Sequence, residues 1–466
     1  MVYENNRGGQ TMKQEKDAAR HALPRYQQIA RQLTQAILSG ELLPGSRLPS
    51  SRTMALEMGV ARATIENAYG DLAAQGWLER RGQAGTFVSQ TLSPAQPAFT
   101  TSAPPAGNRE PLPFQMGLPA LDAFPRALWS RLMGRRLRLQ TRFDLAAPPC
   151  EGEAVLRQAI VDYLRFSRSI DCQPEQVFIT AGYSMAMTLA LRALAQPGEG
   201  IFLEDPGFPF IRPVLAQAGL RFCPVAVDSE GMDIRQGSQR YPDARFALIT
   251  PAHQSPLGVA LSLPRRRELL DWAALNDRWV IEDDYDSEFR YHGKPLPPVK
   301  SLDAPQRVIY AGTFSKSLFP ALRTAWLVAP PQCVAAFRQV AQHLPCTVPP
   351  LYQHTIADFI REGHFWRHLK KMRHCYGQRR QWLESALAEQ GFAVTPQQGG
   401  IQLVVPVTGN DSEMASKAVK AGLAVQAISD WRMAHKGESG LLMSFTNIVS
   451  PEQARKQARA LREALK

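Results

Sequence analysis

A proline-rich segment at residues 91–113 constrains the fold of this chain more than any other feature. Its sequence, TLSPAQPAFTTSAPPAGNREPLP, has six prolines and almost no large apolar side chains. Such a stretch cannot bury enough apolar surface to fold, and its prolines keep it extended. We therefore expect a linker between a small domain at 20–90 and a large domain at 114–466. The alternative is a long surface loop within one domain, although such loops are uncommon in compact domains.

The composition excludes several classes of protein. Apolar residues make up 44% and charged residues 21% of the 466 positions, values close to those of ordinary globular proteins. No apolar run approaches the ~20 residues that a membrane-spanning helix needs, and residues 1–20 lack the apolar core of a secretory signal. Six cysteines lie far apart without metal-ligand spacing, which is typical of reduced thiols. We therefore expect a cytoplasmic protein that does not bind membranes.

The small domain is predicted to contain three helices followed by a hairpin. Residues 24–40 have apolar side chains at spacings of three and four and end in a glycine, which predicts a helix. A serine at position 50 can cap a short second helix, and the apolar positions of residues 60–76 share one face of a third. Residues 77–80 and 86–88 flank a glycine-containing turn, which predicts two paired strands.

This order predicts a winged helix-turn-helix, in which the second short helix enters the major groove of double-stranded DNA. Its outward side chains can reach base edges or phosphates, a helix start attracts phosphate, and wing arginines neutralise backbone charge. The candidate DNA-binding residues are Ser50, Ser51, Arg52, Arg62, Thr64, Asn67, Arg80 and Arg81. The net charge of +12 does not decide the matter, because residues 20–90 have eight basic and five acidic side chains. The alternative is a protein-docking bundle with a solvated basic face.

Short apolar runs alternate with helix-like segments throughout the large domain. The runs lie at 177–179, 201–203, 246–249, 279–281, 308–310 and 325–328. Such alternation predicts an α/β fold with a mostly parallel sheet that helices cover on both faces. In sheets of this kind, functional groups gather at the carboxyl ends of the strands.

Four strand ends have polar clusters, at residues 180–184, 251–258, 282–286 and 311–323. The first is a glycine turn at a helix start that can hold a phosphate or act only as an N-cap. In the second, a single histidine would usually be structural. The three carboxylates of the third could instead chelate Mg²⁺. In the fourth, Lys316 lies among small hydroxyl residues, where its pKa can fall and its amine can become a Schiff-base nucleophile.

The order of these clusters predicts pyridoxal 5′-phosphate (PLP) as the cofactor. PLP needs a covalent lysine, a phosphate cup and an aspartate on its pyridinium nitrogen. An anionic aspartate keeps that nitrogen protonated, so that the ring acts as an electron sink. We include no metal ion in the predicted site.

Two families resemble the two halves of the chain. Residues 24–90 resemble the N-terminal domain of the GntR family of bacterial regulators, in PRYQQIARQLTQAILSGELLPGSRLPSSRTMA, GVARATIENAY and LAAQGWLERRGQAGTFV. From Phe114 to Lys466 the chain resembles fold-type I aminotransferases, in APPCEGEAVLRQAIVDYL, FITAGYSMAM, EDPGFPF, ITPAHQSPLG, VIEDDYDSEFRY and YAGTFSKSLFPALRTAW. The combination resembles the MocR subgroup of GntR regulators.

The resemblance implies a role in PLP binding for each matching position. Lys316 would form the internal aldimine, Asp283 would pair with the pyridine nitrogen, and Tyr285 would hydrogen-bond the phenolic oxygen. Phe208 would stack on the ring, and Arg323 would face the phosphate or an effector carboxylate. The phosphate cup would consist of Thr313, Ser315 and the backbone of Gly182, Tyr183 and Ser184.

The sequence departs from the aminotransferase pattern in two places. Where these enzymes commonly have Asn-Pro-Thr-Gly, this chain has Ser255 followed by Pro-Leu-Gly, so the contact to the phenolic oxygen would pass to Gln254 or to water. The carboxylate-binding arginine near the last strand is absent from residues 441–445, and Arg432 is the nearest candidate. These departures argue against full transamination, but they are compatible with PLP binding.

The resemblance implies a transcriptional regulator that binds operator DNA and senses PLP or an amino compound that reacts with it. Fold-type I proteins usually form homodimers, which in this subgroup are head-to-tail, so we expect one here. The first alternative is an aminotransferase with an accessory DNA-binding module. The second is an inert dimerisation scaffold fused to a DNA-binding domain.

Overall fold

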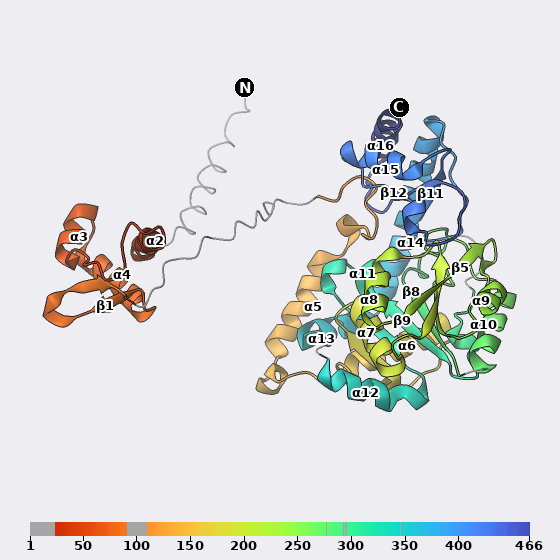
Figure 1. Cartoon of the computed structure of the whole chain (residues 1–466), viewed down its shortest axis with the longest axis horizontal. Coiled ribbons are helices and arrows are strands. Elements are labelled where there is room, and N and C mark those ends of the chain that lie inside the picture. The colour runs from red at the N-terminus through yellow and green to blue at the C-terminus, as the bar shows by residue number, and fades with distance from the viewer. Residues whose placement is uncertain (1–23, 91–109, 276, 292, 294–295, 345) are drawn as a thin grey trace, which may run out of the picture. The chain divides into compact units, whose positions relative to one another are not determined.

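The computed structural model describes residues 24–90 and 110–466, apart from 276, 292, 294–295 and 345. The chain divides into two compact units, Met1–Asn108 and Arg109–Lys466 (Figure 1). Most of the expected linker lies outside the described residues, but Pro113 at its end belongs to the large unit, where its carbonyl accepts a hydrogen bond from the Ala424 N–H. Across the described ranges, no helix has both the length and the apolar character to cross a membrane.

The small unit is a three-helix bundle with a two-stranded hairpin. Its elements are α2 (Arg25–Leu38), α3 (Ser51–Met58), α4 (Arg62–Ala74), β1 (Leu78–Arg80) and β2 (Thr86–Val88). The strands pair antiparallel, with Leu78 opposite Val88. The predicted helical spacing buries Ile29, Leu33 and Ile37 of α2 against one face of α4. The expected winged helix-turn-helix is confirmed.

An eight-stranded sheet forms the centre of the large unit, in the order β3-β10-β9-β8-β7-β4-β5-β6. Its strands are β3 (Val177–Thr180), β4 (Gly200–Asp205), β5 (Arg221–Asp228), β6 (Gly231–Met232), β7 (Ala244–Ile249), β8 (Trp279–Asp284), β9 (Val308–Thr313) and β10 (Ala325–Val328). The strands from β5 through β4, β7 and β8 to β9 are parallel, whereas β10 runs antiparallel to both β3 and β9. The expected mostly parallel α/β fold is therefore confirmed.

Each of the six apolar runs that the sequence indicated became a strand, whereas β5 and β6 were not anticipated. The missed strand β5 lies near one edge of the sheet and alternates between buried and partly exposed residues. It therefore lacks the continuous apolar run by which the central strands are recognised.

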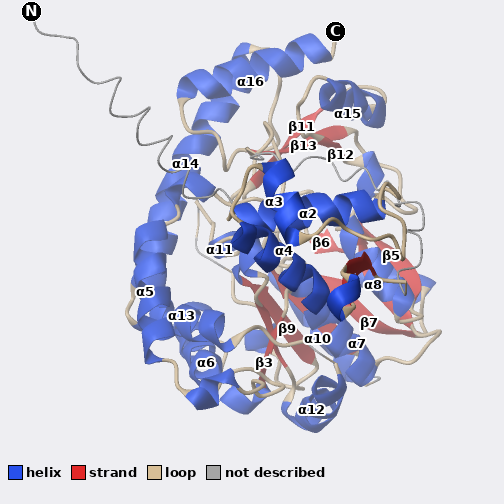
Figure 2. Cartoon of the chain, turned by 90° about the vertical axis from the view of Figure 1, so that its left-hand side faces the viewer, coloured by secondary structure: helices blue, strands red, loops and turns tan. Residues whose placement is uncertain are grey.

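Helices cover both faces of this sheet because successive strand residues point to opposite sides. The helices of the large unit are α5 (Arg126–Leu139), α6 (Ala154–Arg168), α7 (Tyr183–Leu194), α8 (Arg212–Gln217), α9 (Ile234–Arg240), α10 (Leu263–Leu275), α11 (Phe314–Ser317), α12 (Val334–His343), α13 (Pro350–Arg361), α14 (His364–Glu389), α15 (Asp411–Lys420) and α16 (Pro451–Ala464). Helices α7, α8 and α12 share a core with Ile309 and its neighbours on one face. The opposite face, which includes Tyr310 and Val308, packs against α6 and α13 and against α9 and α10. Figure 2 shows the strands in red among these helices.

The C-terminal part adds a smaller antiparallel sheet, β11 (Gln402–Pro406), β13 (Gly440–Ser444) and β12 (Gln426–Ala427), in that order. Helices α14, α15 and α16 lie beside it (Figure 2). In the large sheet, Asp283 of β8 lies opposite Ala311 of β9. This register brings the acidic end of β8 beside the segment that leads from β9 to the lysine.

Candidate functional site

The carboxyl ends of β8 and β9 border a cavity of about 420 Å³ in the large unit. It is lined by predicted site residues from five separate segments: Gly182, Tyr183, Ser184, Phe208, Ser255, Asp283, Tyr285, Thr313, Ser315, Lys316 and Arg323. The other walls come from residues that motif analysis did not single out: Met116, Gly117, Phe210, Thr250, Pro320, Ile401, Gln402, Gln426 and Trp431. The sheet and the C-terminal part therefore both contribute to one site.

Lys316 lies in the short helix α11, directly after β9. Its Nζ donates a hydrogen bond to the carbonyl of Gly117 at 2.7 Å. Burial lowers the pKa of the Lys316 amine, while Asp286 and Asp283 partly oppose this shift. A lower pKa increases the fraction of neutral amine, which is the form that attacks a carbonyl carbon.

Asp283 is a buried carboxyl at the end of β8, and the hydroxyl of Tyr183 donates a hydrogen bond to it. Burial raises the pKa of Asp283 to about 7, and the nearby acids Asp284, Glu204 and Asp286 add to the shift. A cation held against this carboxyl would stabilise its charged form. The protonated pyridine nitrogen of PLP is such a cation, so Asp283 fits this cofactor.

The turn at Gly182 is shaped to receive an anion. Gly182 has a φ of +93°, a backbone conformation that favours glycine, and it precedes the first residue of α7. A Cβ atom at Gly182 would lie 3.4 Å from the guanidinium carbon of Arg323. Arg323 therefore lies against the helix start, where backbone N–H groups favour phosphate. Arg323 was expected to face either the phosphate or an effector carboxylate, and this position favours the phosphate role.

The hydroxyl of Tyr285 contacts two residues of the loop after β7. It donates to the carbonyl of His253 at 3.0 Å, and the His253 ring Nδ1 lies 3.0 Å from the same oxygen. The side chain of Ser255 also hydrogen-bonds it. His253 Nδ1 lies 3.3 Å from Asp286 as well, and both side chains are buried. The histidine that the sequence suggested to be structural thus helps to position Tyr285.

Gln254 does not line the cavity, contrary to the expected contact with the phenolic oxygen. Its amide nitrogen donates to the carbonyls of Pro206 and Ser255, both at 2.9 Å, and its oxygen accepts from the Leu257 N–H. These contacts turn the side chain into the protein interior, where it is 1% exposed. Ser255 faces the cavity instead.

Arg432 does not line the cavity either. Its Nη2 donates to the carbonyl of Glu438 at 2.6 Å, so the side chain folds back on its own loop. The preceding residue, Trp431, is the one that reaches the cavity wall.

The carboxylates of residues 282–286 have different partners and do not converge. Glu282 accepts hydrogen bonds from the N–H groups of Val299 and Lys300, whereas Asp284 accepts from Arg168 at 3.2 Å. Within the described ranges, no group of three or more His, Cys, Asp or Glu residues is arranged to hold a metal ion.

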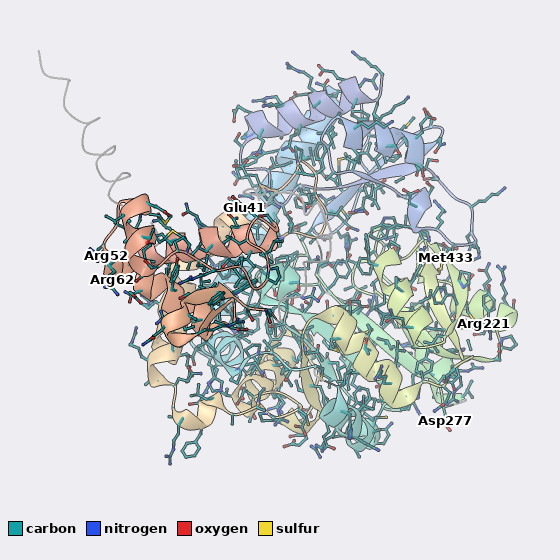
Figure 3. All side chains as sticks on the ribbon, turned by 60° about the vertical axis from the view of Figure 1, so that its left-hand side comes forward. Glu41, Arg52, Arg62, Arg221, Asp277 and Met433 are labelled. Carbon is teal, nitrogen blue, oxygen red and sulfur yellow. The ribbon has the colours of Figure 1, made fainter. Side chains whose placement is uncertain are left out.

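In the small unit, the predicted DNA-binding residues gather at the start of α3, the start of α4 and the hairpin. Ser50 caps α3 by accepting from the Thr53 N–H at 3.1 Å. Figure 3 shows Arg52 and Arg62 close together at one edge of the small unit. Asn67 is exposed and Thr64 is half-buried on α4, and Arg81 lies over the Phe87 ring at 4.8 Å.

Glu66, which sequence analysis did not single out, organises this face. Ser51 donates to its carboxylate at 2.6 Å, and Arg62 and Arg80 each lie 3.6 Å from it. The hydrogen bond from Ser51 and the two guanidinium groups lower the pKa of Glu66. One carboxylate thus joins helix α3, helix α4 and the hairpin through three of the predicted residues.

Comparison with known proteins identifies both parts of the chain. Residues 25–88 match the family described as "Bacterial regulatory proteins, gntR family", and residues 131–454 match "Aminotransferase class I and II". The chain is 33% identical to the probable rhizopine catabolism regulatory protein MocR of Rhizobium meliloti, over 95% of this chain and 94% of that protein. It is 30% identical to the HTH-type pyridoxine biosynthesis transcriptional regulator PdxR of Corynebacterium glutamicum, over 90% and 91%.

Among solved structures, the large unit is similar to LysN, an α-aminoadipate aminotransferase of Thermus thermophilus. That structure is complexed with N-(5′-phosphopyridoxyl)-L-leucine. The similarity has a TM-score of 0.69 at 28% identity and covers 76% of this chain and 92% of that one.

Proposed function

This chain belongs to the GntR family of bacterial regulators, in the MocR-type group whose members have a class I and II aminotransferase domain, and we propose that it is a PLP-binding transcriptional regulator. Its small unit would bind operator DNA, and its large unit would sense PLP or an amino compound that reacts with it. The observation that carries the proposal is the single cavity that brings Lys316, Asp283 and the Gly182 turn together.

The cavity residues divide the recognition of PLP among themselves. Lys316 would hold the aldehyde carbon covalently, Asp283 would accept a hydrogen bond from the ring nitrogen, and Phe208 would pack on the ring. Tyr285, whose hydroxyl lies beside His253 and Ser255, would turn its proton from the His253 carbonyl to the phenolic oxygen. The phosphate would be bound by Thr313, Ser315, Arg323 and the backbone of Gly182, Tyr183 and Ser184. When bound, PLP supplies an aldehyde that condenses with primary amines and a ring that withdraws electrons.

An amine in the cavity would act on DNA binding through Lys316. A competing amine would bond to the aldehyde carbon in place of Lys316 and so release the lysine side chain. In the cofactor-free structure the Lys316 Nζ contacts the carbonyl of Gly117 near the start of the large unit. Such an effector changes DNA affinity only if it binds one arrangement of the protein more tightly than another. The size of the change is limited by that difference in binding free energy. The segment around Gly117 is therefore a candidate for the part of the large unit whose conformation changes when an amine displaces Lys316.

We also propose that the protein is a homodimer that acts in the cytoplasm, where bacterial DNA is found. Large apolar side chains are exposed near the end of α5: Leu137 is 58% exposed, Leu139 62%, Phe143 73% and Leu145 75%. Monomeric proteins rarely leave such apolar clusters in water. A second copy of the chain that covers this stretch would remove that surface from solvent.

The function is tested by DNA selection with the PLP-loaded full chain. Genomic fragments that bind are sequenced, and their affinity is measured with and without PLP. We expect one enriched sequence, an affinity that changes several-fold on removal of PLP, and no steady conversion of amino donor and keto acceptor. Sustained turnover without an enriched sequence would support the aminotransferase alternative. Sequence-specific DNA binding without PLP absorbance would support the scaffold alternative.

The raised pKa of Asp283 predicts how cofactor-free stability depends on pH. Burial raises the pKa of Asp283 from 3.8 to about 7. Between these two pH values the carboxyl is therefore protonated in the folded chain but ionised in the unfolded chain. The stabilisation is complete below pH ~4 and is lost as pH rises to ~7, which for one such group amounts to ~4 kcal/mol. We expect the unfolding free energy of the cofactor-free protein to fall over this range.

Urea unfolding at several pH values between 5 and 8 measures this dependence. Asp283→Asn should reduce the slope, and saturation with PLP should do the same, because a protonated ring nitrogen offsets the buried negative charge. Asp271→Asn, at an exposed position on α10, is the matched control and should leave the slope unchanged. If the unfolding free energy of the Asp283→Asn protein changes with pH as steeply as that of the parent, the raised pKa of Asp283 does not cause the dependence.

A further inference from the structure

We infer that the cavity selects primary amines with an aromatic or bulky apolar side chain and discriminates against amino acids, because its described lining residues offer a carboxylate no cation that the cofactor would leave free. The inference rests on the proposed function, in which an amine reacts at the PLP site. It adds the chemical class of that amine.

The charged side chains of the cavity are already used by the cofactor. Among the described residues that line it, these are Asp283, Lys316 and Arg323. Asp283 would engage the ring nitrogen, and Lys316 would hold the aldehyde carbon until an amine displaces it. Burial lowers the pKa of the Lys316 amine, which favours its neutral form after displacement. Arg323 lies against Gly182 at the phosphate turn. An effector carboxylate would therefore enter the cavity without a cation of its own, at the desolvation cost of an unpaired charge.

Two arginines next to the Trp431 segment are held by backbone carbonyls. Arg432 donates to Glu438 at 2.6 Å. Arg212 donates to the carbonyls of Gly207 and Trp431. The loop after Trp431 is in turn fixed by Asp205, whose carboxylate accepts from the N–H groups of residues 433, 434 and 435, all at 2.8 Å. Moving Arg432 into the cavity would require this loop to change.

The two amide side chains of the wall are neutral, and each has a contact within the protein. The oxygen of Gln426 accepts a hydrogen bond from the Trp431 ring N–H at 3.1 Å, and the Gln402 amide nitrogen donates to the carbonyl of Pro256 at 3.4 Å. Neither side chain can supply the positive charge that an arginine offers to a carboxylate.

Aromatic rings form another part of the cavity wall. The ring centroid of Phe208 lies 5.4 Å from that of Phe210 and 5.9 Å from that of Trp431. Phe210 is 64% exposed, so its ring is available to a ligand, and Met116 and Ile401 add apolar surface. Aromatic rings bind one another at such separations in edge-to-face or offset geometry. A phenyl or indole group on the amine would complete this cluster.

The test titrates the PLP-loaded full chain with four amines: 2-phenylethylamine, phenylalanine, phenylalaninamide and propylamine. Binding is followed by the change in PLP absorbance and by the shift in thermal unfolding. We expect half-saturation by 2-phenylethylamine at a concentration at least 10-fold lower than by phenylalanine or propylamine. Phenylalaninamide, which has the same skeleton without the charge, should behave like 2-phenylethylamine.

Variants separate the aromatic contribution. Phe210→Ala should weaken the binding of 2-phenylethylamine at least 5-fold and leave the binding of propylamine nearly unchanged. The control is Phe166→Ala, at a position 82% exposed on α6, which should change the binding of neither amine. The inference would be overturned if phenylalanine bound as tightly as its amide, or if Phe210→Ala left the affinity for 2-phenylethylamine unchanged. Either result would leave the proposed function intact. Failure to take up PLP at all would overturn the proposed function itself.

Discussion

Replacement of Lys316 by alanine is expected to abolish the near-visible absorbance of PLP added to the protein, which the parent chain should show as a yellow colour. The reason is covalent: the Lys316 Nζ is the cavity amine that can bond to the aldehyde carbon, and its lowered pKa favours the reactive form. Without that bond, PLP is held by hydrogen bonds and stacking alone. We expect its retention to weaken by ~10²-fold or more, which corresponds to ~3 kcal/mol.

The fold should tolerate this change, because the Lys316 side chain makes one hydrogen bond, to Gly117, in the cofactor-free structure. Far-ultraviolet circular dichroism and the unfolding midpoint should therefore match the parent. Lys456→Ala, which removes an exposed lysine from α16, is the control and should keep the colour. If the Lys316→Ala spectrum equals that of the parent, the cofactor assignment is wrong.

Replacement of Arg62 by alanine should weaken operator binding. Arg62 begins α4, its side chain is 68% exposed, and Ser51 and Glu66 hold it in place. A guanidinium in this position can bridge a guanine edge or grip a phosphate. If Arg62 reads a guanine, we expect a loss of ~1–3 kcal/mol of binding free energy and a relaxed preference at one base pair. If it binds a phosphate, the slope of log affinity against log salt concentration should fall in magnitude by ~1.

Both quantities come from DNA-binding titrations at several salt concentrations. Arg31→Ala removes an exposed arginine from α2 of the same unit and serves as the charge-matched control. It should leave the preference of the protein for the operator over other sequences unchanged. Identical affinity and salt slope for the Arg62→Ala and parent proteins would mean that α4 does not enter the groove.

The sequence was sufficient to predict the elements of the small unit, six strands of the large sheet and most of the residues that line the cavity. Helical spacing located α2 and α4, and continuous apolar runs located six strands of the large sheet, because period and propensity are local properties. The polar clusters at strand ends were also readable, and the Gly182 turn and Lys316 both line the cavity. The strand β5 was missed because it alternates between buried and partly exposed residues and lacks a continuous apolar run.

The tertiary structure decided which side chains face the cavity, and here sequence reasoning about Gln254 and Arg432 was misleading. Both lie within a few residues of the site along the chain, yet backbone carbonyls of nearby loops hold them elsewhere. The contacts of Gly117 with Lys316 and of Tyr183 with Asp283 join segments about 200 and 100 positions apart. Local sequence specifies the turns and strand ends, but the direction of each side chain depends on hydrogen bonds and packing that exist only when distant segments meet.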